Sequence, residues 1–127
     1  ANAAISGQLL TTSGITLKSD LEVLEFNDYF VFQTTNVGMH PFVNDCIIED
    51  EKFYKKCSEG IDLIYTPQNT AFIKNMKAGG KKCINGLDML IMQGVAAFEL
   101  WNDAKVSAEI IAYVKDILVK KLSEGMK

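Results

Sequence analysis

Short apolar runs separated by longer amphipathic stretches are the main pattern of this chain. Residues 29–34 form a continuous β-branched and aromatic run, which is typical of a strand buried on both faces. Two further runs, residues 61–65 and 82–84, predict a second strand and a short third strand. Residues 15–18 predict one more short strand near the start of the chain.

Apolar residues at helical spacing predict helices between and after these strands. The predicted helices span residues 19–26, 49–58, 70–78, 87–101 and 107–122. Gly79 and Gly80 end the third of these helices, and Asn85 and Ser107 are suited to cap the two that follow. Residues 1–14 are small and polar, and we expect them to be a weakly structured segment or the remnant of a tag.

The alternation of strands and helices predicts an α/β fold. We expect a partial Rossmann-like parallel sheet of three or four strands, with flanking helices and a C-terminal helix, over residues 15–127. Ligands of such sheets bind at the carboxyl ends of the strands. The loops that follow Thr34, Tyr65 and Ile84 are therefore the places to search for a site.

Composition limits the classes of protein that this chain could represent. Its 127 residues are enough for about one domain, and 48% are hydrophobic, which excludes a disordered tail. The net charge is −3 and all 13 basic residues are Lys, which argues against a nucleic-acid-binding protein, because Arg makes the bidentate contacts to phosphate and guanine. No apolar run is long enough for a membrane span.

The three cysteines form no CxxC pair, so we expect a reduced, cytoplasmic chain without a structural metal. Several catalytic signatures are missing as well. The chain has no GxGxxG and no GxSxG, and Gly79-Gly80-Lys81 does not have the spacing of a P-loop. The single histidine, His40, is interpreted as a surface or capping residue.

Three loops carry candidate chemistry. Thr34 to Met39 offers hydroxyls and a glycine, which suit a ribose or an amide; the alternative is an ordinary turn. Tyr65 places a phenol at the end of a strand, where it either binds a ligand or covers the sheet edge. Gly86, Met89 and Gln93 share one helical face, and Gln93 either binds a polyhydroxy ligand or is an amide of the core.

Taken in order, these loops resemble the C-terminal, cofactor-binding half of shikimate dehydrogenase. That family has the strings TTPxGM, DxxYNP and NGLxMLxxQ, followed by AFELW. Here the corresponding segments are residues 34–39, 62–67, 85–93 and 97–101. The resemblance covers about residues 15–122, with Asn36 and Thr66 standing where the family has Pro and Asn.

The resemblance implies reduction of 3-dehydroshikimate to shikimate by NADPH, a step of the shikimate pathway of aromatic amino acid biosynthesis. It implies that Tyr65 and Gln93 bind the substrate. It implies cofactor contacts, along the ribose and nicotinamide, for Thr34, Thr35, Val37, Met39, Leu63, Gly86 and Met89.

The family's glycine-rich loop and first strand, and its catalytic Lys and Asp, have no counterparts in these motifs. No residue of this chain is therefore assigned a catalytic role, and we expect a fragment that is inactive alone and associates with itself through an exposed sheet edge. NAD in place of NADP, and quinate in place of shikimate, stay open. The alternative is a non-catalytic interaction or scaffold module of the same fold.

Overall fold

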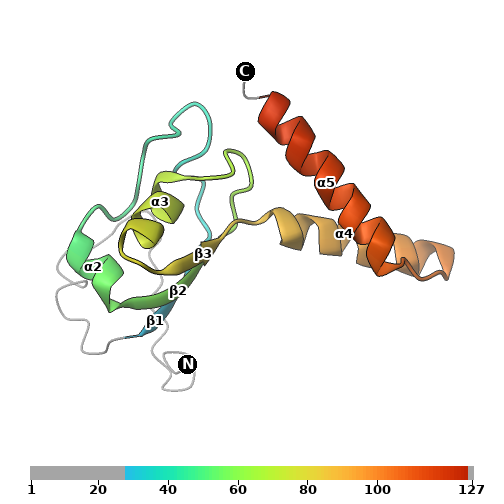
Figure 1. The fold of residues 1–127 in the computed structure, drawn as a ribbon, viewed down its shortest axis with the longest axis horizontal. Helices are drawn as coiled ribbons and strands as arrows, with labels where there is room; N and C mark the ends of the chain where they lie inside the picture. The colour runs from blue at the N-terminus through green and yellow to red at the C-terminus, as the bar shows by residue number, and fades with distance from the viewer. Residues whose placement is uncertain (1–27, 126–127) are drawn as a thin grey trace. The chain divides into compact units, whose positions relative to one another are not determined.

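Three parallel strands form one sheet in the computed structural model, which describes residues 28–125 (Figure 1). The strands are β1 (Tyr29–Gln33), β2 (Cys57–Asp62) and β3 (Lys82–Ile84), and they lie side by side in this order. The predicted α/β class with a parallel sheet is confirmed.

Four helices accompany the sheet within the described residues. They are α2 (Glu51–Lys56), α3 (Ala71–Ala78), α4 (Leu87–Asn102) and α5 (Ala108–Glu124). The chain divides between Asn85 and Gly86 into two compact units. The first holds the sheet with α2 and α3, and the second holds α4 and α5.

The core of the first unit lies between the sheet and α3 (Figure 1). It is built from the buried side chains of Phe53, Tyr54, Cys57, Phe72, Ile73, Met76 and Cys83. Gly60 of β2 lets helix and sheet approach closely, because a Cβ there would lie 2.9 Å from the Met76 side chain. Bulk at this position would have to displace a core side chain.

The other face of the sheet is exposed. Phe32, Ile61 and Ile84 form one cross-strand row on this face, and Phe32 and Ile84 are 60% and 49% exposed. Phe30 lies beside Phe32, with ring centroids 5.0 Å apart. The described residues therefore cover only one face of a sheet type that is usually covered on both.

Most predicted elements have the expected positions. The strands predicted at 29–34 and 82–84 are β1 and β3, and the helices predicted at 70–78, 87–101 and 107–122 are α3, α4 and α5. Thr70 and Ser107 cap their helices by accepting the amide protons of Ile73 and Ile110. The predictions for residues 1–14, 15–18 and 19–26 lie outside the described residues.

Two predictions for residues 49–65 were wrong in their bounds. The helix predicted at 49–58 is shorter, because the chain enters β2 at Cys57. The strand predicted at 61–65 begins four residues earlier and ends at Asp62. Pairing with β1, from Tyr29 with Cys57 to Gln33 with Asp62, decides this register against the weak strand propensity of Ser58-Glu59-Gly60.

No helix within residues 28–125 has the length and apolar character needed to cross a bilayer. No group of three or more His, Cys, Asp or Glu side chains there is arranged to hold a metal ion.

Alkaline pH is expected to destabilise the first unit. Burial raises the pKa of both Cys57 and Cys83 from 9.0 to about 11. A folded-state pKa above the unfolded value gives stability that is complete below pH 9.0 and is lost as the pH rises through about 11. Each thiol adds a slope of at most about 1.4 kcal/mol per pH unit.

Urea unfolding under reducing conditions between pH 8 and 11 measures this effect. A Cys57→Ala/Cys83→Ala variant is the control, because it is less stable at pH 8 yet loses less stability on going to pH 11. Equal pH slopes for the two proteins would contradict the prediction.

Candidate functional site

A cavity of about 320 Å³ opens where β1 and β2 end. It is formed by two loops that are far apart in the sequence and follow neighbouring strands. Its lining residues are Thr34, Thr35, Asn36, Met39, Leu63, Ile64, Tyr65 and Thr66. The structure thus brings together two of the three loops that the sequence indicated, at the sheet edge where parallel sheets bind ligands.

The first wall of the cavity is the loop of residues 34–39. Gln33, the last residue of β1, holds this loop in place by hydrogen bonds. Its side-chain oxygen accepts hydrogen bonds from the Thr35 amide and hydroxyl at 2.5 and 2.8 Å. Its side-chain nitrogen donates to the Val37 carbonyl at 3.1 Å. The Thr35 hydroxyl in turn accepts the Val37 amide proton at 3.2 Å. These bonds close the turn that presents Thr34 and Asn36 to the cavity.

The second wall is organised by Asp62, the last residue of β2, which is completely buried. One carboxylate oxygen accepts from the Ile64 amide at 3.0 Å, and the other accepts from the Thr70 hydroxyl at 2.5 Å. Burial raises the pKa of Asp62, and its two hydrogen bonds oppose that rise. Since Thr70 caps α3, this wall is tied to a helix of the core.

Gln33 and Asp62 have roles that the sequence motifs did not reveal. The available signal is a polar residue next to apolar residues of a predicted strand, because a buried amide or carboxylate needs hydrogen-bond partners. Gln33 follows Phe32 and Asp62 lies between Ile61 and Leu63, and both are buried in the structure.

The predicted site residues of these two loops have different positions. Thr34, Thr35, Met39, Leu63 and Tyr65 line the cavity. Val37 does not line it, and its amide and carbonyl groups are used within the loop. Gly38 has a φ of +98°, a backbone conformation that L side chains rarely adopt, so this turn favours glycine.

The third loop spans the boundary between the two units. Asn85 does not cap α4 as predicted; its side chain instead donates to the Gln68 carbonyl at 3.1 Å. Gly86 occupies the cap position without a side-chain hydrogen bond, and it is buried. Met89 and Gln93 are exposed on α4, so Gln93 is not a core amide.

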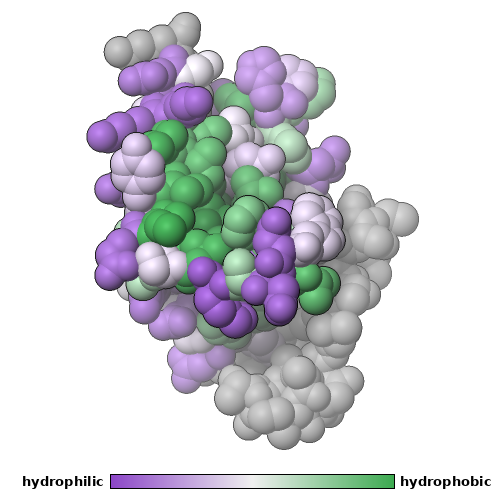
Figure 2. Space-filling view, turned by 90° about the vertical axis from the view of Figure 1, so that its right-hand side faces the viewer, coloured by the Kyte–Doolittle hydropathy of each residue, from purple (hydrophilic) through white to green (hydrophobic). Residues whose placement is uncertain are grey.

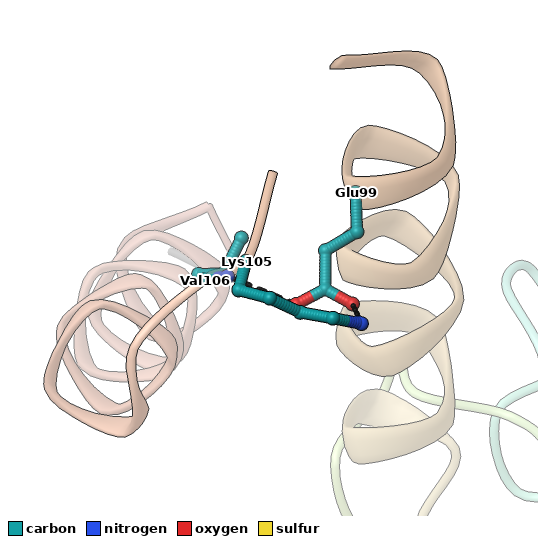
Figure 3. Close-up of polar contacts among 3 residues, drawn as sticks. All are labelled: Glu99, Lys105 and Val106. Carbon is teal, nitrogen blue, oxygen red and sulfur yellow. Dashed lines mark hydrogen bonds and ion pairs between the residues drawn. The ribbon is translucent and has the colours of Figure 1, made fainter. Parts of the chain in front are cut away.

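Helix α4, which carries Met89 and Gln93, is joined to α5 by a turn that Glu99 organises (Figure 3). One oxygen of Glu99 accepts from the Val106 amide at 2.9 Å, and the other pairs with the Lys105 ammonium at 2.9 Å. A second ion pair joins Lys115 of α5 to Asp88 at the start of α4 at 2.6 Å. These contacts define the geometry of the helix pair within its own unit.

The helix pair has much exposed apolar surface. Figure 2 shows hydrophobic side chains gathered over these helices. The large exposed apolar side chains of the pair are Met89, Met92, Phe98, Leu100, Trp101, Ile110, Tyr113 and Val114.

Known proteins match this chain over most of its length. A family model described as the shikimate 5'-dehydrogenase C-terminal domain matches residues 86–112. A shikimate dehydrogenase (NADP(+)) from Clostridium perfringens is 42% identical over 86 residues, which are 67% of this chain and 31% of that protein. This chain is a relative of the C-terminal part of shikimate dehydrogenases. It spans about a third of the length of this curated relative.

Solved shikimate dehydrogenase structures share the fold. A chorismate mutase/shikimate 5-dehydrogenase fusion protein from Clostridium acetobutylicum matches 95% of this chain and 42% of its own, with 30% identity and a TM-score of 0.76. A shikimate dehydrogenase in complex with NADP+ matches 73% of this chain and 31% of its own, with 33% identity and a TM-score of 0.63. The resemblance to this family inferred from the motifs is confirmed.

The α4–α5 turn of this shikimate dehydrogenase relative is expected to respond to acid. Hydrogen bonds from Val106 and Lys105 lower the pKa of Glu99 below its ordinary 4.5. Such a group contributes stability above 4.5 that is lost as the pH falls through its lower folded-state pKa. We expect the amide resonance of Val106 to titrate with a midpoint below 4.5 in an NMR series. Gln in place of Glu99 should abolish this titration, and a Val106 midpoint at or above 4.5 would contradict it.

Proposed function

We propose that this chain supplies the nicotinamide side of the cofactor site, and part of the substrate site, of an NADP-dependent shikimate dehydrogenase. The intact oxidoreductase would convert 3-dehydroshikimate and NADPH to shikimate and NADP. The single observation that carries the proposal is that loops 34–39 and 63–66, selected from the sequence as separate motifs, line one cavity at the carboxyl edge of the sheet.

The residues of the cavity fit the nicotinamide and ribose part of NADP. Met39 and Leu63 offer apolar surface for a flat ring, and the Thr34 side chain offers a hydroxyl for a ribose. A volume of about 320 Å³ lies at the lower end for small-molecule sites and is suited to part of a dinucleotide. The bound cofactor would supply the hydride, and the residues named here would orient its ring. Thr35, Val37, Gly86 and Met89 complete the proposed cofactor contacts.

Tyr65 and Gln93 are the proposed substrate contacts. Tyr65 lines the cavity and is 39% exposed, and Gln93 is exposed on α4. Each of these side chains, a phenol and an amide, offers a donor and an acceptor for the hydroxyl groups of shikimate. No residue of this chain is proposed to move the proton; that role belongs to the Lys and Asp that the family resemblance implies.

Several finer points are part of the proposal. The fold would cover residues 15–127 as the C-terminal part of a Rossmann-like NADP-binding domain, and the location would be cytoplasmic, in keeping with the free thiols Cys46, Cys57 and Cys83. A quinate-type substrate, NAD as cofactor, or a non-catalytic scaffold role are the alternatives. No observation favours any of them over shikimate and NADP.

A chimera tests the proposed activity. This chain would replace the matching C-terminal part of the Clostridium perfringens shikimate dehydrogenase, and NADP reduction by shikimate would be followed by absorbance. We expect turnover, and a Gln93→Ala chimera should lose about tenfold to hundredfold in kcat/KM, mainly through a higher KM for shikimate. A lost substrate hydrogen bond with an unpaired partner costs about 1–3 kcal/mol.

Lys120→Ala is the matched control, because Lys120 is an exposed residue of α5 outside the proposed site. It should leave kcat/KM within about twofold, as expected for surface changes. A folded chimera that turns over neither shikimate nor quinate would contradict the enzyme proposal and favour the scaffold role. Equal rates for Gln93→Ala and the parent chimera would remove Gln93 from the substrate site.

We further propose that the chain associates with itself through the edge of its sheet. Among the described residues β1 lies at one end of the strand order, and its exposed Phe30 and Phe32 add apolar surface there. Light scattering after size exclusion should give a mass that rises with concentration, and Phe32→Lys should reduce it. A mass that stays at the monomer value at high concentration would contradict this proposal.

A further inference from the structure

Gln33 and Asp62 occupy equivalent positions at the ends of neighbouring strands. They are the last residues of β1 and β2, they are paired in the sheet register, and they are 6% and 0% exposed. The Leu63 amide donates to the Gln33 carbonyl at 2.9 Å, so the first residue of the second wall is hydrogen-bonded to the end of β1. Burial of two polar side chains at the base of a cavity costs free energy unless each is fully bonded.

The two side chains are bonded to different kinds of partner. Asp62 reaches Thr70, which caps α3, so the second wall is anchored to a helix of the core. Within residues 28–125 the side chain of Gln33 bonds to Thr35 and Val37, which lie in the loop that it organises. Apart from these bonds, the turn has one backbone bond, from the Met39 amide to the Asn36 carbonyl at 3.1 Å. The hydrogen bonds of the first wall therefore centre on Gln33 and stay within its own loop.

The Gln33 network also decides what the loop offers to a ligand. The Thr35 hydroxyl donates to Gln33 and accepts from the Val37 amide, so its proton is not available to a ligand. Thr34, with an exposed side chain on the cavity, is left as the hydroxyl donor of this wall. Loss of Gln33 would free Thr35 and Val37 to make other bonds, and the wall would have several conformations in place of one.

We propose that Gln33 is a positioning residue that holds the Thr34–Met39 wall of the cavity in the geometry that receives the cofactor. The part of this inference that concerns the cofactor rests on the proposed function. Preorganisation of this kind acts on affinity, because a wall that is already ordered loses less conformational entropy when a ligand binds.

Three variants of the full chain test the proposal. Gln33→Leu has nearly the same shape and removes both the acceptor for Thr35 and the donor for Val37. Gln33→Glu keeps an acceptor for Thr35, but it replaces the donor to the Val37 carbonyl with an oxygen and adds a buried negative charge. Gln33→Asn is the conservative rescue, because an Asn side chain commonly accepts a hydrogen bond from the amide two residues on, which is Thr35 here.

Two measurements separate the inference from the proposed function. Amide hydrogen exchange of Thr35 and Val37 reports the wall itself, with the amides of α3 as an internal control for global stability. Titration with NADP+ reports affinity. In Gln33→Leu we expect at least tenfold faster exchange at Thr35 and Val37 with α3 unchanged, and about tenfold weaker NADP+ binding. Gln33→Asn should restore most of both.

Unchanged exchange and unchanged NADP+ affinity in folded Gln33→Leu would overturn the inference. If Gln33→Leu does not fold, Gln33→Glu decides in the same way, with faster exchange at Val37 supporting the inference and wild-type exchange overturning it. If the wild-type chain binds no NADP+ while the exchange of the wall responds to Gln33, the positioning role stands and the cofactor assignment fails.

Discussion

The parallel register of β1 and β2 is the constraint on which the candidate site depends. It sets Gln33 beside Asp62 at the carboxyl edge of the sheet, with both side chains buried. Buried polar groups must be hydrogen-bonded, and the nearest partners are the backbone and hydroxyl groups of the loops that follow. Each loop is therefore hydrogen-bonded to the last residue of the strand that precedes it. The cavity is the space between the two loops.

Among the described residues of the first unit, the buried core lies on one side of the sheet. Helix α3 buries Ile73 and Met76 against Cys57 and Cys83, and Gly60 permits the close approach. The opposite face leaves Phe32 and other apolar side chains in contact with water, and α4 and α5 leave a second apolar area in the other unit (Figure 2). Exposed apolar areas of this kind usually mark surfaces that bind other polypeptide.

Local signals account for the elements that were predicted correctly. The run Tyr29–Gln33 has strand propensity throughout, and α3 has a capping Thr70 before it and Gly79-Gly80 after it. The position of β2 could not be read in this way. Ser58, Glu59 and Gly60 have weak strand propensity, and they form a strand because β1 and β3 pair with this segment on either side and Met76 packs on Gly60.

For the candidate site as well, some residues were predicted from the sequence and others were identified only in the structure. The motifs predicted which loops matter, and Thr34, Met39, Leu63 and Tyr65 do line one cavity. They did not show that Gln33 and Asp62 hold the walls, that Val37 is used inside its loop, or that Asn85 bonds to Gln68 and not to α4.

By itself the sequence determined the α/β class, which follows from local propensity and spacing along the chain. It also determined the family resemblance and the loops that carry chemistry, which rest on short motifs of neighbouring residues. The tertiary structure alone decided the register of β2, the cavity and the partners of the buried polar groups. These depend on contacts between residues that are far apart in the chain, and spacing carries no information about such contacts.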